Sequence, residues 1–221
     1  YSWDDSAVVP VVASAGNADA IPIGQVSAVS GAAAADAIRA GFRLARQGCV
    51  GALVMAPLTK ESLALAEGYP SEFELFAALT GVEEVRAAIA WRDLVRITVT
   101  EHLAFRNILA RLTPERIVTA AVQLEDVMRG LGMAEPRLAV AALNPHGGEG
   151  GLFGDEERTV IAPAVETLAE RGIVLRGPIP ADTVWVRAMQ GEFDGVVFLY
   201  HDQGNIAMKA VGFGEAVLIY A

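Results

Sequence analysis

Residues 137–154, RLAVAALNPHGGEGGLFG, join a short apolar run to a stretch with five glycines. The apolar run, 137–143, has the length and composition of a strand that is buried on both faces. The segment before it, 114–132, has Pro in its first turn, an apolar stripe and a terminal Gly, which predicts a helix. A second helix is expected from near Asp155 to Gly172. A buried strand between two helices is typical of a parallel sheet covered by helices.

The same alternation continues in both directions along the chain. Further helices are expected at 31–48, with Ser30 as the N-cap, at 59–66 and at 72–80. Further strands are expected at 51–57, at 86–91, at 95–101, just after Gly172 and at 194–200. We therefore predict an α/β fold with a mostly parallel or mixed sheet flanked by helices.

The composition excludes several classes of protein. The 221 residues are 53% hydrophobic and 20% charged, which suits a folded domain with a sizeable core. Apolar runs are too short for a membrane span. A net charge of −10 disfavours nucleic acid as a partner. Cys49 has no second cysteine to pair with, and its apolar neighbours predict a buried, inert thiol. Because no signal peptide is recognisable at the start, we expect a cytoplasmic protein.

The sequence contains three histidines, and each follows a predicted strand. His102 follows 95–101, His146 follows 137–143 at a distance of three residues, and His201 follows 194–200. In open α/β sheets, ligands bind outside the carboxyl ends of the strands. Three neutral imidazoles are a common set for Zn, Co, Ni or Fe(II). A shared metal site is therefore one hypothesis, and separate structural histidines are the other, because the sequence does not fix the strand order.

Polar groups in neighbouring loops leave similar alternatives. The glycines of 144–154 precede a helix start, which is typical of an anion site but also of a flexible turn. The spacing differs from that of a dinucleotide-binding fingerprint. Asp182, in the segment GPIPADT, is expected in a loop stiffened by Pro, as a metal ligand, a partner of a base or an N-cap. Lys209 is a candidate for binding an anionic substrate or a solvated surface group.

Several long segments together resemble one family. NPHGGEGGLFGDEE (144–157), GPIPADT (177–183) and LYHDQGNIAMK (199–209) are similar to segments of the 4-hydroxythreonine-4-phosphate dehydrogenase family and its catabolic paralogues. APLTKESL (56–63) and RITVTEHLAFRNI (96–108) match further segments in the same order. The resemblance implies an isocitrate/isopropylmalate dehydrogenase-like fold. It also implies a homodimer with shared active sites.

The resemblance further implies a reaction and roles for individual residues. The reaction is NAD- or NADP-dependent oxidation of a secondary alcohol beside a carboxylate, followed by decarboxylation, and it requires a divalent metal such as Zn, Mg, Co or Mn. His102, His146 and His201 are the implied metal ligands, and the position of His201 comes from the partner subunit in the family. His201 also counts among the implied catalytic residues. Asp182 is implied in substrate orientation or proton transfer, and Lys209 in binding the substrate anion.

One segment departs from the family pattern. The family carries Gly-His-Thr-Glu where this chain has Ser71-Glu72-Phe73-Glu74, so the His and Thr that contact the substrate phosphate are missing. In another register, Gly68-Tyr69-Pro70-Ser71 resembles the terephthalate cis-dihydrodiol dehydrogenases. Ser71 and Glu72 are thus expected to contact a substrate that is unphosphorylated or differently shaped.

The resemblance covers about residue 20 to the end of the chain. We expect one family domain over 1–221, with two lobes in space, and without the N-terminal Gly-rich segment and the C-terminal Asp-His-Gly-Thr segment that helps to bind cofactor. Two other functions stay open at this point. One is a carboxylated cis-dihydrodiol dehydrogenase of aromatic catabolism, and the other is a metal-binding paralogue without activity.

Overall fold

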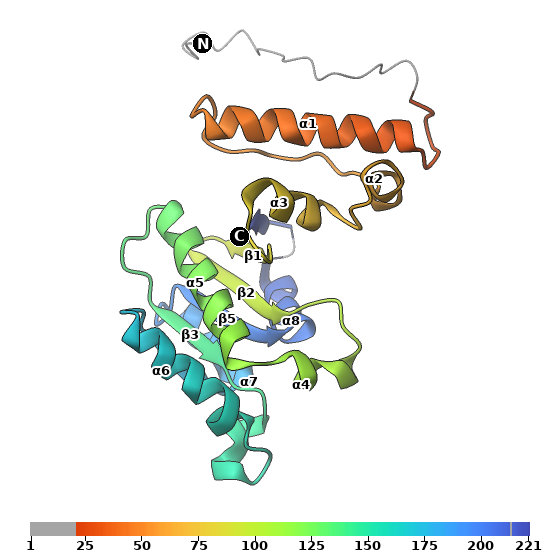
Figure 1. The fold of residues 1–221 in the computed structure, drawn as a ribbon. Coiled ribbons are helices and arrows are strands. Elements are labelled where there is room, and N and C mark those ends of the chain that lie inside the picture. The colour runs from red at the N-terminus through yellow and green to blue at the C-terminus, as the bar shows by residue number, and fades with distance from the viewer. Residues whose placement is uncertain (1–20, 213) are drawn as a thin grey trace. The chain divides into compact units, whose positions relative to one another are not determined.

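The computed structural model describes residues 21–212 and 214–221, which form two compact units that separate between Val85 and Arg86. The sequence motifs that carry the histidines all lie in the second unit. Figure 1 shows the elements of both units along the chain.

The first unit is a small cluster of three helices, α1 (Ala28–Arg46), α2 (Lys60–Glu67) and α3 (Glu72–Thr80). The three helices predicted in this region are confirmed. Helix α1 begins earlier than predicted, because the hydroxyl of Ser27, rather than that of Ser30, accepts a hydrogen bond from the backbone of the first turn. Gly31 lets α1 and α2 touch, since a Cβ at this position would lie 1.9 Å from the carbonyl oxygen of Ser62.

Two predictions in the first unit are wrong. Residues 51–57 form no strand, and Val54 is 91% exposed within this irregular segment. Cys49 is exposed rather than buried, because it follows the turn that ends α1. The strands of the described sheet all come from the second unit, and residues 51–57 pair with none of them.

The second unit is built on a six-stranded sheet with the order β4-β3-β5-β2-β1-β6. The strands are β1 (Ala87–Trp91), β2 (Leu94–Thr100), β3 (Leu138–Ala141), β4 (Leu175–Ile179), β5 (Gly195–Tyr200) and β6 (Val217–Tyr220). Strands β4, β3, β5 and β2 are mutually parallel, whereas β1 runs antiparallel to both β2 and β6. The predicted α/β class with a mixed sheet is confirmed, and β6 is a strand that the sequence pattern did not reveal.

Helices cover both faces of this sheet and bury its central strands. On one face, α5 (Pro114–Gly130) and α6 (Ala162–Glu170) pack on alternate residues such as Ile97 of β2 and Val197 of β5. On the other face, α7 (Ala181–Met189) and α8 (His201–Gly212) pack on Val196 and Phe198 of β5. Figure 1 shows α5 and α6 together on one side of the strands. Burial on both faces explains why these strands read as continuous apolar runs.

The remaining helical segments lie next to the site. They are η2 (Phe105–Asn107) and α4 (Ile108–Arg111) after β2, η3 (Pro145–Gly151) after β3, and the π-helical turn η4 (Glu157–Ile161) that leads into α6. Helices α4, α7 and α8 were not predicted. Within the residues that the structure describes, no helix is both long and apolar enough to cross a membrane.

Candidate metal and substrate site

Four parallel strands end at the same edge of the sheet, and each delivers a predicted site residue there. In sheet order, β4 leads to Asp182, β3 to His146, β5 to His201 and β2 to His102. Strand β5 is central among the three that lead to histidines, and Thr100 of β2 pairs with Tyr200 of β5. The strand order that the sequence left open therefore places these residues where open α/β sheets bind ligands.

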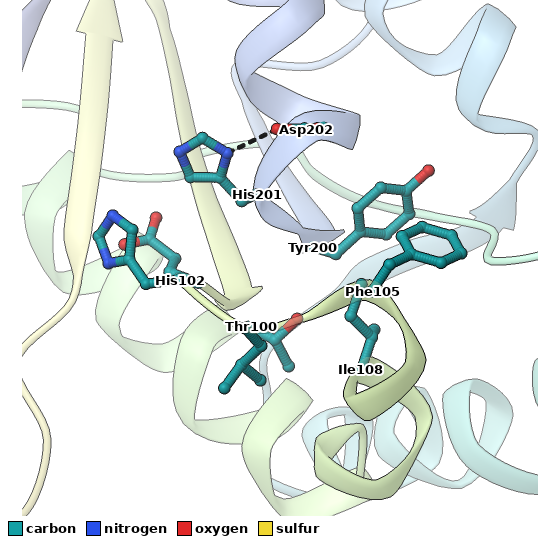
Figure 2. A pocket seen from close by; sticks show the side chains of 9 residues that line it. Thr100, His102, Phe105, Ile108, Tyr200, His201 and Asp202 are labelled. Atoms are coloured by element: carbon teal, nitrogen blue, oxygen red, sulfur yellow. Dashed lines mark hydrogen bonds and ion pairs between the residues drawn. The ribbon is translucent and has the colours of Figure 1, made fainter.

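His102 and His201 come together in one pocket of about 280 Å³. Their ring centroids lie 5.6 Å apart and their planes are tilted by 44°. The pocket is lined by Thr100, Glu101, His102, Leu103, Phe105, Ile108, Tyr200, His201 and Asp202. Figure 2 shows the two imidazoles on one side of the pocket and the rings of Tyr200 and Phe105 on the other. These rings meet edge to face at a centroid distance of 5.7 Å and form the apolar wall.

The position of each imidazole follows from its element. His201 is the first residue of α8, and its Nδ1 lies 2.7 Å from a carboxylate oxygen of Asp202 (Figure 2). A carboxylate on one ring nitrogen orients the other nitrogen for a metal. His102 directly follows Glu101 and has φ of 49°, an uncommon conformation for a residue other than glycine. A histidine that adopts this conformation must be held by its neighbours.

Glu101 connects the pocket to buried polar groups beneath it. Its carboxylate accepts a hydrogen bond from the hydroxyl of Thr98, and it lies 3.9 Å from the guanidinium of Arg96. Burial lowers the pKa of Arg96 to about 10, although the charge of Glu101 acts in the opposite direction. The guanidinium is therefore still charged at neutral pH and balances one carboxylate of the site.

His146 reaches the same edge but does not line this pocket. It stands in a run of six residues with positive φ, His146 to Gly151, which curls the chain tightly after β3. Its Nδ1 lies 3.3 Å from the carboxylate of Glu149, and its ring lies 6.2 Å from that of Phe153. Within residues 21–212 and 214–221, no group of three His, Cys, Asp or Glu side chains is close enough to hold a metal.

The glycine-rich loop is fixed at its base by carboxylates of the chain itself. Glu157 is 8% exposed and accepts hydrogen bonds from the backbone N–H groups of Leu143 and Asn144, at 2.8 and 2.7 Å. The side-chain amide of Asn144 donates to Glu157 and to Glu156, at 2.9 and 2.7 Å. The bond from Asn144, together with backbone N–H groups at the helix start, lowers the pKa of Glu156. The carboxylates of Glu156 and Glu157 thus occupy N–H donors of Leu143 and Asn144 that could otherwise bind an external anion.

Asp182 and Lys209 differ from their predicted settings. Asp182 is exposed in the first turn of α7 rather than in a loop, because α7 begins directly after Pro180. Lys209 is exposed in the last turn of α8. It lies eight residues after His201, about 12 Å farther along the helix axis. One chain therefore brings Asp182 to the edge where the histidines lie and places Lys209 away from that edge.

Ser71 and Glu72 lie in the first unit, where the structure gives both of them local contacts. The hydroxyl of Ser71 accepts a hydrogen bond from the backbone N–H of Phe73 and donates one to Glu74, so it caps α3. The carboxylate of Glu72 lies 3.9 Å from the amino group of Lys60. Contact of these side chains with a substrate stays a prediction.

Sequence reasoning missed two charged residues of the pocket, Glu101 and Asp202. Each is the immediate sequence neighbour of a histidine, in TEH and HD respectively. A carboxylate next to a candidate ligand was the available signal, because charged groups around a metal ligand orient it. Tyr200 and Phe105 carry no comparable signal, since aromatic residues at a strand end and in a loop are usually packing residues.

The fold and the site define a class of protein. A largely parallel sheet between two layers of helices, with imidazoles and carboxylates at its carboxyl edge, is the arrangement of an α/β protein that binds a small polar ligand. The family model described as pyridoxal phosphate biosynthetic protein PdxA matches residues 4–221. The chain belongs to this family.

Two curated relatives show the range of names in the family. A 4-hydroxythreonine-4-phosphate dehydrogenase of Beijerinckia indica is 42% identical over 216 residues, which are 97% of this chain and 64% of that protein. A D-threonate 4-phosphate dehydrogenase of Salmonella typhimurium is 39% identical and covers 92% of this chain and 62% of its own length. The chain thus spans somewhat less than two thirds of the length of these relatives.

Solved structures agree with this assignment. The crystal structure of 4-hydroxythreonine-4-phosphate dehydrogenase from Klebsiella pneumoniae has a TM-score of 0.87 and 41% identity, covering 92% of this chain and 62% of that chain. A terephthalate 1,2-cis-dihydrodiol dehydrogenase from Burkholderia xenovorans has a TM-score of 0.70 and 28% identity, covering 95% of this chain and 66% of that chain. Of these two structures, the 4-hydroxythreonine-4-phosphate dehydrogenase is thus the more similar to this chain in both TM-score and identity.

Proposed function

We propose that this chain carries the metal and substrate site of an NAD(P)-dependent dehydrogenase that oxidises a small hydroxy acid or its phosphate and then releases CO2. The observation that carries this proposal is the convergence of His102 and His201 in one pocket, at the edge that also receives His146 and Asp182. The names of the relatives support the same reaction class.

The donor set of the pocket fits a divalent metal. Imidazole nitrogens suit Zn or Co better than Mg, which prefers oxygen ligands. His102 and His201 would hold such an ion, and the wider site includes the carboxylates of Glu101 and Asp202. When bound, a divalent ion polarises the substrate hydroxyl and stabilises negative charge on its oxygen.

His146 is the third ligand in this proposal. One described chain does not bring His146 to the other two histidines. The resemblance implies a site shared between two copies, in which the position of His201 is supplied by the partner. In the described chain His201 already stands beside His102, so His146 is the ligand that a second copy would add. We therefore propose a homodimer with two sites. Each site is a complete set of three imidazoles formed from both copies.

The other polar residues would act on the substrate. Asp182, exposed at the same edge, would orient the hydroxy acid or take the proton that its hydroxyl loses. Lys209 would bind the substrate anion, and its distance from His201 along α8 favours a role in a second copy's site. Oxidation moves a hydride to NAD or NADP and leaves a β-keto acid, whose carboxylate departs as CO2.

The chain gives mixed signals on the phosphate of the substrate. The relatives' names contain a 4-phosphate, whereas Glu72 and Phe73 stand where the family has its phosphate-binding His and Thr. Glu72 and Glu74 put negative charge in the first turn of α3, which disfavours a dianion there. The carboxylated cis-dihydrodiol remains the second candidate, because a dehydrogenase of that kind shares the fold.

The test is a nicotinamide reduction assay. The protein is stripped of metal with a chelator and reloaded with Co or Zn. It is then offered NAD or NADP with 4-hydroxythreonine-4-phosphate, D-threonate 4-phosphate or a carboxylated cis-dihydrodiol in separate reactions. We expect metal-dependent reduction with one substrate, and at least a hundredfold loss of kcat/KM in His102→Ala.

Three outcomes distinguish the candidates. Turnover of a phosphate ester supports the main proposal, and turnover of the dihydrodiol alone replaces it with the second candidate. Metal binding without turnover of any substrate identifies a metal-binding paralogue and overturns the dehydrogenase assignment.

The net charge of −10 further supports a small-molecule substrate rather than nucleic acid. The cytoplasmic location stays a prediction.

A further inference from the structure

Arg96 is a fully buried cation directly beneath the pocket. It lies in the middle of β2, between Ile89 of β1 and Val196 of β5, and its side chain is 1% exposed. In residues 21–212 and 214–221, its Nε and Nη1 atoms have no hydrogen-bond partner. A buried arginine that satisfies its donors incompletely costs free energy, so stability alone does not explain a guanidinium at this position.

The partners that Arg96 does have come from two different segments. Its Nη2 donates a hydrogen bond to the side-chain oxygen of Asn205, a buried residue of α8. Its Nη1 lies 3.9 Å from Glu101, whose carboxylate Thr98 also holds. Close packing of α8 on the sheet makes the first contact possible. Gly204 precedes Asn205, and a Cβ there would lie 2.8 Å from the ring of Phe198.

Each of these partners is next to one of the two imidazoles. Glu101 directly precedes His102, which has a left-handed backbone conformation. Asn205 follows His201 by four residues, about one turn of α8. One guanidinium thus contacts the segment of His102 and the helix of His201 at the same time.

We propose that Arg96 is a positioning residue that fixes His102 and His201 at the edge of the sheet, acting through Glu101 and Asn205. It touches neither imidazole. Arg96 sets where the two side chains stand before a metal arrives, and this preorganisation raises the affinity for the metal. This role rests on the proposed function, because that function assigns the two imidazoles to a metal.

The test measures metal affinity and stability separately. Arg96→Met keeps the apolar stem and removes the guanidinium, and Arg96→Lys keeps the charge but not the forked donor. We expect the Kd for Co, measured by competition with a chromophoric chelator, to rise about 10- to 100-fold in Arg96→Met. Arg96→Lys should recover part of this loss. The denaturant midpoint without metal is measured for each variant, so that the rise in Kd is compared with the loss of stability that follows when Glu101 and Asn205 lose their partner.

Arg137→Met is the matched control. Arg137 is also paired with a carboxylate of the same sheet, but it stands before β3, at the opposite end from the pocket. Its loss should lower the denaturant midpoint and leave the Kd for Co unchanged. Asn205→Leu should weaken Co binding as Arg96→Met does. The double variant should bind Co as tightly as the single variant with the lower affinity, because both changes remove the same link.

The outcomes separate this role from the proposed function. If His102→Ala loses Co binding while Arg96→Met and Asn205→Leu bind like the parent protein, Arg96 has no positioning role and the metal site stands. If His102→Ala itself binds Co normally, the proposed metal site is wrong. Should Arg96→Met fail to fold, Arg96→Lys and Asn205→Leu decide, and parental affinity in both overturns the inference.

Discussion

Arg137 and Asp194 form an ion pair at the end of the sheet opposite to the histidines. The guanidinium of Arg137 donates to both carboxylate oxygens of Asp194, at 2.8 and 2.5 Å, and the backbone N–H of Arg137 adds a third bond at 2.9 Å. These bonds from Arg137 lower the pKa of Asp194. Asp194 precedes β5 and Arg137 precedes β3, so the pair holds the starts of two neighbouring strands in register.

This pair predicts a dependence of stability on pH. A carboxylate whose pKa is lower in the folded state stabilises that state above its ordinary pKa, and the contribution is lost as the pH falls through the lowered value. Asp194→Asn should therefore lower the denaturant midpoint at neutral pH. The difference from the parent protein should shrink toward zero as the pH falls below the ordinary pKa of an aspartate and through the lowered value. Equal midpoints at neutral pH would show that the pair contributes nothing.

At this scale the sequence revealed the histidines but not their surroundings. Each histidine is found from its place after an apolar run, because strand ends are readable from composition. The carboxylates at Glu101 and Asp202 required the fold, since an acidic residue in a loop is ordinarily solvated. Arg96 was hidden for a related reason, because a charged residue within an apolar strand gives no sign of its partners on α8.

Among the elements, the loop of residues 144–154 is held at its start by the side chain of Glu157. Glu157 accepts three hydrogen bonds from the start of this loop. Gly148 brings the loop against it, because a Cβ at Gly148 would lie 2.7 Å from the carboxylate. The loop that carries His146 is thus held on η4, and the contacts with Glu157 help its run of six residues with positive φ to persist.

Removal of this carboxylate should destabilise the second unit. Glu157→Ala leaves two backbone N–H groups without their acceptor, which costs about 2–3 kcal/mol in the free energy of unfolding. Glu157→Gln keeps one acceptor oxygen and should cost less. Glu166→Ala, an exposed change on α6, is the control and should be nearly neutral. Chemical denaturation measures all three, and a loss in Glu157→Ala no larger than in the control would contradict this role.

The elements that sequence patterns missed share a physical cause. Helix α8 contains Gly204 and Gly212, which have low helix propensity, yet both allow close packing, on Phe198 and on Trp91. For residues 51–57, a strand was predicted and the structure has none. Their apolar run is typical of a buried strand, but the backbone pairing that makes a strand depends on neighbours that a local pattern does not contain.

For the molecule as a whole, the strand order decides where the predicted site residues lie. Three predicted ligands and Asp182 follow four strands that are far apart in the sequence and adjacent in the sheet. The parallel direction of these strands was predictable from the alternation of helices and strands, and their order was not. With 22 Gly and a charge of −10, composition alone indicated a folded acidic domain and nothing of this edge.

A site shared between two copies makes a prediction that belongs to this scale. His146→Ala and His201→Ala should each lose bound metal when they are prepared separately. If His146 of one copy completes the pair of His102 and His201 in the other, mixed dimers of the two variants contain one intact set of ligands. Metal binding should then return to at most half of the sites after subunit exchange, measured by equilibrium dialysis. No recovery in exchanged dimers would place all three ligands in one chain.

The most direct measurement is the amount of Co or Zn bound per chain in the parent protein and in His102→Ala, His146→Ala and His201→Ala. Circular dichroism should confirm that each variant is folded. We predict about one metal ion per chain in the parent protein and a loss of at least tenfold in affinity in every variant. Undiminished metal in a folded His102→Ala or His201→Ala would contradict the assignment of the pocket as the metal site.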